Sequence, residues 1–237
     1  MDYFNRLISE TKAVTEPFEK RVCYRADGKA WEDAGRNEVV LLRDTAFELG
    51  GSGLPAVGFN LVTSDKVGES GVTVIGRDLR EIKESCAFAR ISLIEIDDIA
   101  DEQAAYNAIR KIEYVKYHIF PVGYMMRTSS ESLKEQVRVS RQAVKKGITF
   151  EQVGNSLIDR YLENKTVKAA RVIFVTQENA DYGRLYQAAV KNNEITKALN
   201  HALNSISFDC NSCNLKAVCD EVEGMRELHF KKSMQSS

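Results

Sequence analysis

The sequence is poor in the residues that interrupt regular structure: it has only 3 prolines and 14 glycines among 237 residues. Disordered and linker-rich chains are enriched in proline, glycine and polar residues, so this composition argues against that class. Hydrophobic residues make up 43% of the chain and charged residues 28%. This balance predicts a globular protein that buries a core, with room for one large domain or two small ones.

The sequence also lacks an excess of either charge and any long apolar run. Lys and Arg number 33 against 34 Asp and Glu, for a formal net charge of -1, so we expect no global attraction to nucleic acid or to an acidic membrane. No stretch approaches the roughly 18 consecutive apolar residues of a membrane span. Residues 1–10 lack the basic start, apolar middle and cleavage site of a signal peptide. We therefore expect a cytoplasmic protein that binds neither nucleic acid nor membranes.

Hydrophobic periodicity predicts helices and strands that are partly segregated and partly alternating. Helical spacing and capping residues predict helices over residues 1–19, 101–117, 129–145 and 180–203, with a further helix opening at Thr149. Runs of β-branched and alternating residues predict strands over residues 38–42, 56–63, 71–76, 87–96, 119–126 and 167–176. The predicted helix over residues 129–145 is capped by Ser129 or Ser130 and ends before Gly147.

These elements predict an α+β fold with a C-terminal cysteine-rich, metal-binding segment. Its sheet is expected to be mixed and mostly antiparallel, to form mainly before residue 100, and to be packed by helices. The chain divides into an α+β domain over residues 1–204, the cysteine-rich segment over residues 205–230, and a polar, frayed tail over residues 231–237.

Three of the five cysteines, Cys210, Cys213 and Cys219, lie within ten residues of one another, spaced C-x2-C-x5-C. Two intervening residues let both sulfurs of the first pair point at one metal ion or one cluster. Thiolates are soft ligands that select zinc, iron–sulfur clusters, or soft nickel and copper sites. The polar neighbours Asp209 and Asn211 are unlike an apolar core strand, which favours ligands over buried, unligated thiols.

The sequence leaves the fourth ligand of this site open. Cys23 and Cys86 are distant in the sequence but could fold back to the segment, and His229 follows it ten residues after its last cysteine. The fourth position could instead be open to a substrate, a second metal or a partner protein. Spacing alone barely distinguishes zinc from an iron–sulfur cluster, although zinc sites more often contain two C-x2-C pairs.

Two other patterns have plainer interpretations. The glycine-rich residues 50–53 are followed by Pro55 and a predicted strand rather than a helix, so a tight turn is favoured over a phosphate-binding loop. Five arginines are spread over the predicted sheet region, and their spacing favours solvated surface charges over a site that grips phosphate: Arg77, Arg80, Arg90, Arg110 and Arg127.

Several short motifs resemble a known family. The sequence reads ELGGSG at residues 48–53, VIGRDL at residues 74–79 and KKGITF at residues 145–150. Together with the stretch over residues 114–138, these motifs resemble the central region of acetyl-CoA synthase, the β subunit of the carbon monoxide dehydrogenase/acetyl-CoA synthase complex. The resemblance covers roughly residues 35–219, judged by the order of motifs and elements.

The resemblance implies an iron–sulfur centre. In that family four cysteines hold a cubane 4Fe–4S cluster, and one of them also bridges to nickel. Cys210 and Cys213 match the opening C-x2-C pair, with Cys213 at the bridging position. Cys219 matches the third cysteine, although the family's gap there is longer. This sequence has no further cysteine after Cys219 and no Cys-Gly-Cys, the element that holds the family's outer nickel.

The leading hypothesis is therefore an iron–sulfur subunit, related to acetyl-CoA synthase, that transfers electrons or docks a partner. The resemblance places it in a redox or corrinoid-linked complex of one-carbon or CO/acetyl-CoA metabolism. One alternative is a non-catalytic interaction module stabilised by zinc. Another is a nickel–iron–sulfur enzyme whose missing ligands come from another chain.

Overall fold

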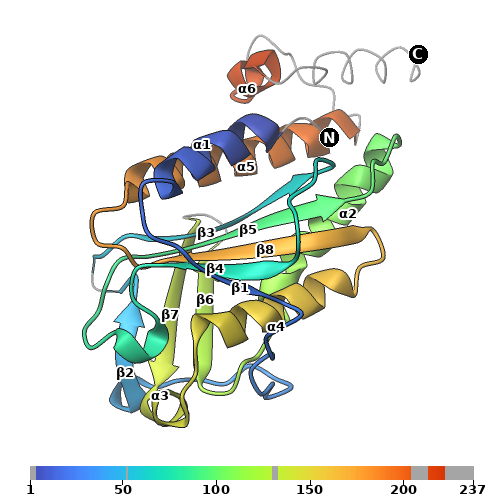
Figure 1. Cartoon of the computed structure of the whole chain (residues 1–237). Helices are drawn as coiled ribbons and strands as arrows, with labels where there is room; N and C mark the ends of the chain where they lie inside the picture. Colours follow the sequence, from blue (N-terminus) through green and yellow to red (C-terminus); the bar gives the residue numbers. More distant parts are fainter. Residues whose placement is uncertain (1–3, 52, 130–132, 204–212, 222–237) are drawn as a thin grey trace, which may run out of the picture.

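A computed structural model describes residues 4–51, 53–129, 133–203 and 213–221 (Figure 1). Within these ranges the strands form a five-stranded sheet in the order β1-β4-β8-β5-β3 and a three-stranded sheet in the order β2-β7-β6. The strands of the larger sheet are β1 (Arg21–Tyr24), β3 (Ala56–Thr63), β4 (Gly71–Ile75), β5 (Phe88–Ile96) and β8 (Val167–Val175). Those of the smaller sheet are β2 (Thr45–Leu49), β6 (Tyr124–Ser129) and β7 (Lys134–Ser140).

The larger sheet is mixed. β1 pairs antiparallel with β4 and β5 antiparallel with β8, whereas β4 with β8 and β3 with β5 are parallel pairs. Both pairings of the smaller sheet are antiparallel. β3 and β4 are buried along their whole length, because elements cover both faces of the sheet and such strands are nearly continuous apolar runs.

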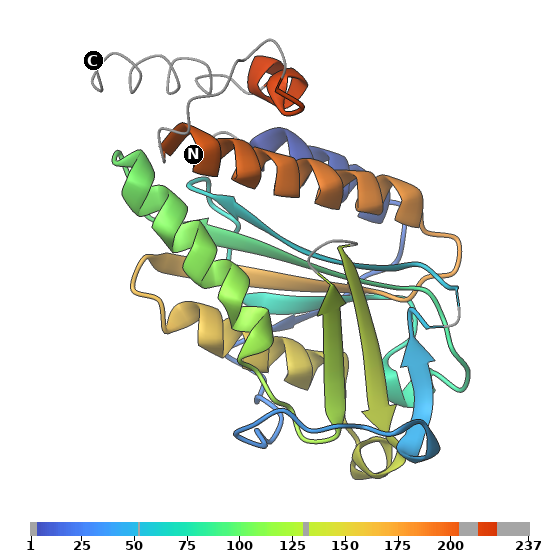
Figure 2. The same cartoon turned by 180° about the vertical axis from the view of Figure 1, so that it is seen from behind.

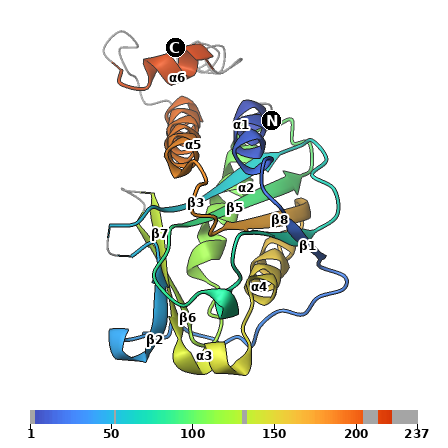
Figure 3. The ribbon, with the colours of Figure 1, turned by 60° about the vertical axis from the view of Figure 1, so that its left-hand side comes forward.

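Helices cover the larger sheet in layers. Helices α1 (Asn5–Thr15) and α5 (Tyr182–Leu203) lie side by side on one face, and α4 (Phe150–Leu162) lies on the other (Figures 1 and 3). Helix α2 (Glu102–Tyr114) packs against α5 and β3, as the view from behind shows (Figure 2). The smaller sheet contacts β3 and β5 through β7. No helix within the described ranges has the length and apolar character needed to cross a membrane.

Short elements complete the fold. Helices α3 (Arg141–Lys146) and α6 (Lys216–Glu221) each have 6 residues. Single 3-10 turns lie at η2 (Leu42–Asp44), η3 (Leu79–Glu81) and η4 (Val115–Tyr117).

Local signals predicted several helix ends correctly. The Asp101 side chain accepts a hydrogen bond from the backbone N–H of Gln103 at the start of α2. Thr149 and Gln152 form a reciprocal capping box at the start of α4. Gly147 ends α3 with a left-handed φ of 90°, a conformation that suits glycine because it has no Cβ.

The predicted helix over residues 129–145 is wrong. Residues 134–140 form β7, and the helix α3 that follows is capped by Ser140 rather than by Ser129 or Ser130. The alternation of buried and half-buried side chains, a period of two, indicates a strand in this segment. Val137 and Val139 are buried and alternate with half-buried polar residues. Pairing with both β2 and β6 then stabilises the strand.

The predicted strand over residues 38–42 is also wrong. This run lies outside the named strands and leads into η2, and Val39 is 76% exposed. The strand begins at Thr45, where pairing with β7 starts. The strand predicted over residues 119–126 begins only at Tyr124, after a turn in which Gly123 has a φ of 71°. Among the described residues, five of the eight named strands precede residue 100, as expected, while β6, β7 and β8 follow it, and the mixed character of the sheet is confirmed.

Candidate functional site

The cysteine segment is described in part, at the outer surface of the molecule. Cys213 precedes α6 and Cys219 lies within it, and both side chains are half-buried against the core. Leu215 and Val218, each 6% exposed, pack α6 against α5. Figure 1 shows α6 above α5, on the side of that helix away from the sheet. Cys210 and His229 lie outside the described residues, as do most of the predicted segment over residues 205–230 and the whole predicted tail.

The other two cysteines lie elsewhere in the fold. Cys23 is on β1 beside Glu151 of α4, and the pKa of its thiol is raised, first by burial and then by the charge of Glu151. Cys86 is buried and forms an isolated backbone β-bridge with Leu49. Burial raises the pKa of its thiol too. Helices α4 and α6 lie on opposite sides of the larger sheet (Figure 1).

The described residues contain no complete metal site. Within those ranges no three Cys, His, Asp or Glu side chains lie close enough together to hold a metal ion. Cys213 and Cys219 are therefore not joined there by Cys23 or by Cys86. Cys213, just before α6, and Cys219, within it, are two of the three predicted ligands, and thiolates are donors that iron–sulfur and zinc sites use; their role as ligands stays a prediction.

A buried polar network lies between the larger sheet and β7. Arg90 on β5 is 0% exposed, and its Nε and Nη2 donate to the Glu135 carboxylate at 2.6 and 2.8 Å. Its Nη1 donates to Asn60 Oδ1 at 2.9 Å and to Ser92 Oγ at 2.7 Å. The Tyr161 hydroxyl on α4 donates to the same Asn60 oxygen at 2.9 Å. Strands β3, β5 and β7 and helix α4 thus meet at one guanidinium.

Two features allow this network to be buried: the charges of Arg90 and Glu135 balance each other, and Gly58 leaves room for the Glu135 carboxylate. Burial alone lowers the pKa of Arg90, but the Glu135 carboxylate more than offsets it, so the pKa of Arg90 is raised and the group stays charged. Gly58 of β3 lies directly against Glu135, and a Cβ at this position would overlap the carboxylate. The interpretation of Arg90 as a surface charge is therefore wrong, although Arg80, Arg110 and Arg127 are exposed as expected.

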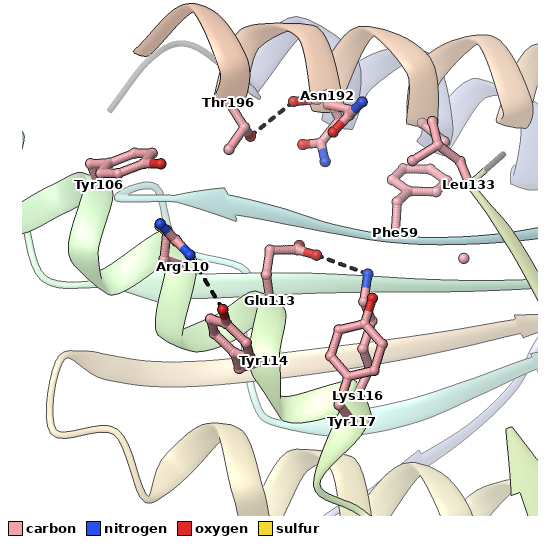
Figure 4. A pocket seen from close by; sticks show the side chains of 13 residues that line it. Phe59, Tyr106, Arg110, Glu113, Tyr114, Lys116, Tyr117, Leu133, Asn192 and Thr196 are labelled. Carbon is pink, nitrogen blue, oxygen red and sulfur yellow. Dashed lines mark hydrogen bonds and ion pairs between the residues drawn. The ribbon is translucent and has the colours of Figure 1, made fainter. Parts of the chain in front are cut away.

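Glu113 connects this network to a pocket. Its carboxylate accepts from Asn60 Nδ2 at 2.9 Å and from Lys116 Nζ at 3.0 Å. The pocket, about 410 Å³ in volume, lies between α2, α5 and β3 (Figure 4). Its lining consists of Gly58, Phe59, Tyr106, Arg110, Glu113, Tyr114, Lys116, Tyr117, Leu133, Ala189, Asn192, Asn193 and Thr196.

One face of α2 supplies an arginine held by two tyrosines. The guanidinium carbon of Arg110 lies 6.0 Å from the ring centre of Tyr106 and 5.9 Å from that of Tyr114, within the range of cation–π attraction. Its Nη2 also donates to the Tyr114 hydroxyl at 3.3 Å. Sequence reasoning missed this cluster. The signal was present as Tyr-x3-Arg-x3-Tyr, a spacing that places the three side chains on one helix face.

Comparison with known proteins identifies a family for this fold. The sequence model of one protein family, the CO dehydrogenase/acetyl-CoA synthase complex beta subunit, matches residues 33–180 of this chain. No curated protein matches the chain. The matched span contains the whole buried network and the α2 wall of the pocket, whereas the cysteine segment and all of α5 lie beyond it. The chain belongs to the family of the CO dehydrogenase/acetyl-CoA synthase complex beta subunit.

Proposed function

We propose that this chain is an iron–sulfur subunit of an acetyl-CoA synthase-type complex, with Cys210, Cys213 and Cys219 as ligands of a cluster of the 4Fe–4S type. It transfers electrons or docks a partner subunit in one-carbon, corrinoid-linked or CO/acetyl-CoA metabolism. The family match supports the metabolic setting. The observation that carries the cluster is the position of Cys213, just before the short helix α6, and of Cys219 within it, both half-buried where that helix packs onto α5.

The position of α6 suits an exchange of electrons with another protein. The helix forms an outer layer beyond α5 (Figure 3), so a centre held there is close to the molecular surface. Solvent exposure and nearby hydrogen bonds are among the properties that set the potential of such a cluster. The fourth ligand is His229, a residue of a partner, or a substrate at an open position, since Cys23 and Cys86 do not join Cys213 and Cys219 among the described residues.

A structural zinc site is the second candidate, because α6 is only 6 residues long. Helices shorter than about 12 residues are marginal on their own, and a metal ion held by the same thiols and His229 would stabilise the segment. In that case chelation would unfold the C-terminal part and leave the sheet intact. A nickel centre completed by another chain is the third candidate, and it would show nickel binding in stoichiometric amount only when that chain is present.

Anaerobic purification, an absorption spectrum and metal analysis test the proposal. The wild type is expected to be brown, with a broad band in the visible region and about four irons per chain. Cys213→Ser is expected to lose both. The matched control is Cys23→Ser, which changes a thiol on β1 beside α4 and is expected to keep colour and iron.

Other outcomes would reject the cluster. A colourless wild type with one zinc per chain would establish the interaction module instead. Iron retained in full by Cys213→Ser would show that the C-terminal cysteines are not its ligands. Loss of iron in Cys23→Ser would show that β1 supplies a ligand, against the placement of this residue in the structure.

A further inference from the structure

We propose that the pocket between α2 and α5, here called the Arg110 pocket, binds a small aromatic monoanion, that is, a flat ring bearing one acidic group. This site is separate from the cysteine segment, and the inference does not depend on the identity of the metal. Its volume of about 410 Å³ falls within the range of small-molecule sites. Three features of the pocket select the ligand: its unbalanced charge, its aromatic walls and its polar roof.

Among the described residues that line the pocket, the charges leave one cation unbalanced. Lys116 is neutralised by Glu113 at 3.0 Å, and the Arg90 guanidinium beneath the pocket is neutralised by Glu135 at 2.6 Å. Arg110 also lines the pocket, but among the described residues it has hydrogen-bond and ring contacts with tyrosines only and no carboxylate partner. A guanidinium forms two parallel hydrogen bonds with a carboxylate or a similar acidic group. One negative charge on a ligand therefore completes the balance.

The walls of the pocket present aromatic surface beside that cation. Tyr114 and Tyr117 project from the last turn of α2 and from η4, and both are exposed, with ring centres 6.5 Å apart in an edge arrangement. Figure 4 shows Tyr106, Arg110 and Tyr114 on the side of α2 that borders the pocket. The two tyrosines that contact Arg110 hold its side chain in place, which reduces the entropy lost when it grips a ligand. A flat ring can stack on the exposed tyrosine faces while its acidic group meets Arg110.

The roof supplies hydrogen-bonding groups and space. Asn192, Asn193 and Thr196 of α5 line the pocket, and Asn192 is only 9% exposed. Figure 4 shows Asn192 and Thr196 on the opposite side of the pocket from α2. Amide groups both donate and accept hydrogen bonds, so they suit polar substituents on a ring. Ala189, one turn earlier in α5, leaves room because its side chain is a single methyl group.

Binding of a fluorescent aromatic sulfonate to the full chain tests this inference. 8-Anilinonaphthalene-1-sulfonate carries one negative charge on a flat ring system, and N-phenyl-1-naphthylamine is its neutral counterpart. We expect the sulfonate to bind the wild type more tightly than the neutral compound. Arg110→Gln is expected to weaken the sulfonate at least about tenfold, the effect of losing one charge-assisted contact, with little change for the neutral compound.

Matched variants separate the site from general surface effects. Arg80→Gln removes an exposed arginine of η3, and this variant is expected to bind both compounds as the wild type does. Tyr114→Ala removes a ring and is expected to weaken both. Circular dichroism verifies that each variant is folded. No sulfonate binding by the wild type, equal weakening by Arg110→Gln and Arg80→Gln, or equal loss of both compounds in Arg110→Gln would each overturn the inference.

Discussion

Arg90 and Glu135 place two ionised groups at the centre of the molecule, where they are 0% and 1% exposed. Taking charges out of water is costly, and the cost is offset only when geometry and hydrogen bonds satisfy both groups. Here the guanidinium donates two hydrogen bonds to the carboxylate, and Asn60 and Ser92 accept hydrogen bonds from its third nitrogen. The pair fixes how β5 and β7 lie against one another.

Removal of one partner from this pair is expected to destabilise the fold strongly. Glu135→Gln keeps the volume of the side chain but leaves the Arg90 charge buried without its counter-charge. We expect the free energy of unfolding, measured by urea denaturation, to fall by about 3–5 kcal/mol. The matched control is Glu10→Gln, which breaks the exposed Arg6–Glu10 pair on α1 and is expected to have no measurable effect. Equal losses in the two variants would contradict the importance of the buried pair.

Arg90 also shows a limit of sequence reasoning at the scale of the residue. Most of its neighbours in the run over residues 88–96 are apolar, and the pattern predicts a strand there correctly. The partner that makes a charge tolerable there is 45 positions away on β7, in a segment that we predicted to be a helix. A pattern read along the chain cannot show such a pairing.

At the scale of the element, α6 is held to the rest of the molecule by few contacts. Among the described residues, the buried apolar side chains here are Val218 of α6 and Leu215, the residue just before it. A helix of this length depends on such packing rather than on its own propensity. The half-burial of Cys213 and Cys219 depends on the same packing.

Loss of this packing is expected to expose the cysteine thiols. In the metal-free protein, Leu215→Ala should raise the alkylation rates of Cys213 and Cys219 at least about tenfold, because loss of a buried leucine side chain costs about 2–5 kcal/mol. Mass spectrometry with an alkylating reagent measures the rate at each cysteine. The thiol of Cys86 in the main core serves as an internal reference and should stay slow. Lys216→Ala, at an exposed position of α6, should change nothing, and a rate increase there equal to that of Leu215→Ala would contradict the packing argument.

Elements with a strong local signal were predicted well. The strand over residues 56–63 has the observed bounds of β3, and the cap at Thr149 marks the start of α4. The strand predicted over residues 38–42 was wrong because an apolar composition does not by itself supply a partner strand. The helix predicted across residues 134–140 was wrong because the serines before the segment suggested a helix cap. The alternation of the buried Val137 and Val139 with polar residues was the stronger signal, and it indicates a strand.

At the scale of the whole molecule, residues 4–203 contain both sheets and the helices that cover them, and α6 is added outside α5. The family match over residues 33–180 covers most of this core and none of the cysteine segment. Core and segment are therefore expected to be separable, as the division near residue 204 predicts.

A chain shortened to residues 1–204 tests this separation. We expect it to unfold in a single cooperative transition, with a free energy of unfolding about 2–4 kcal/mol below that of the full chain, because Leu215 and Val218 no longer bury apolar surface. It should bind no iron after anaerobic purification. Thermal denaturation followed by circular dichroism and iron analysis provide the two measurements. An unfolded shortened chain would show that the C-terminal segment is part of the core.

The sequence by itself determined the positions of most helices and strands, the mixed α+β class, the grouping of the cysteines and the resemblance to the family. Each of these depends on periodicity, caps or spacing between neighbours along the chain. Only the tertiary structure decided that Arg90 is paired in the core and that Arg110 lines a pocket beneath Asn192. Such contacts join residues far apart in sequence, and their geometry is set by how whole elements pack.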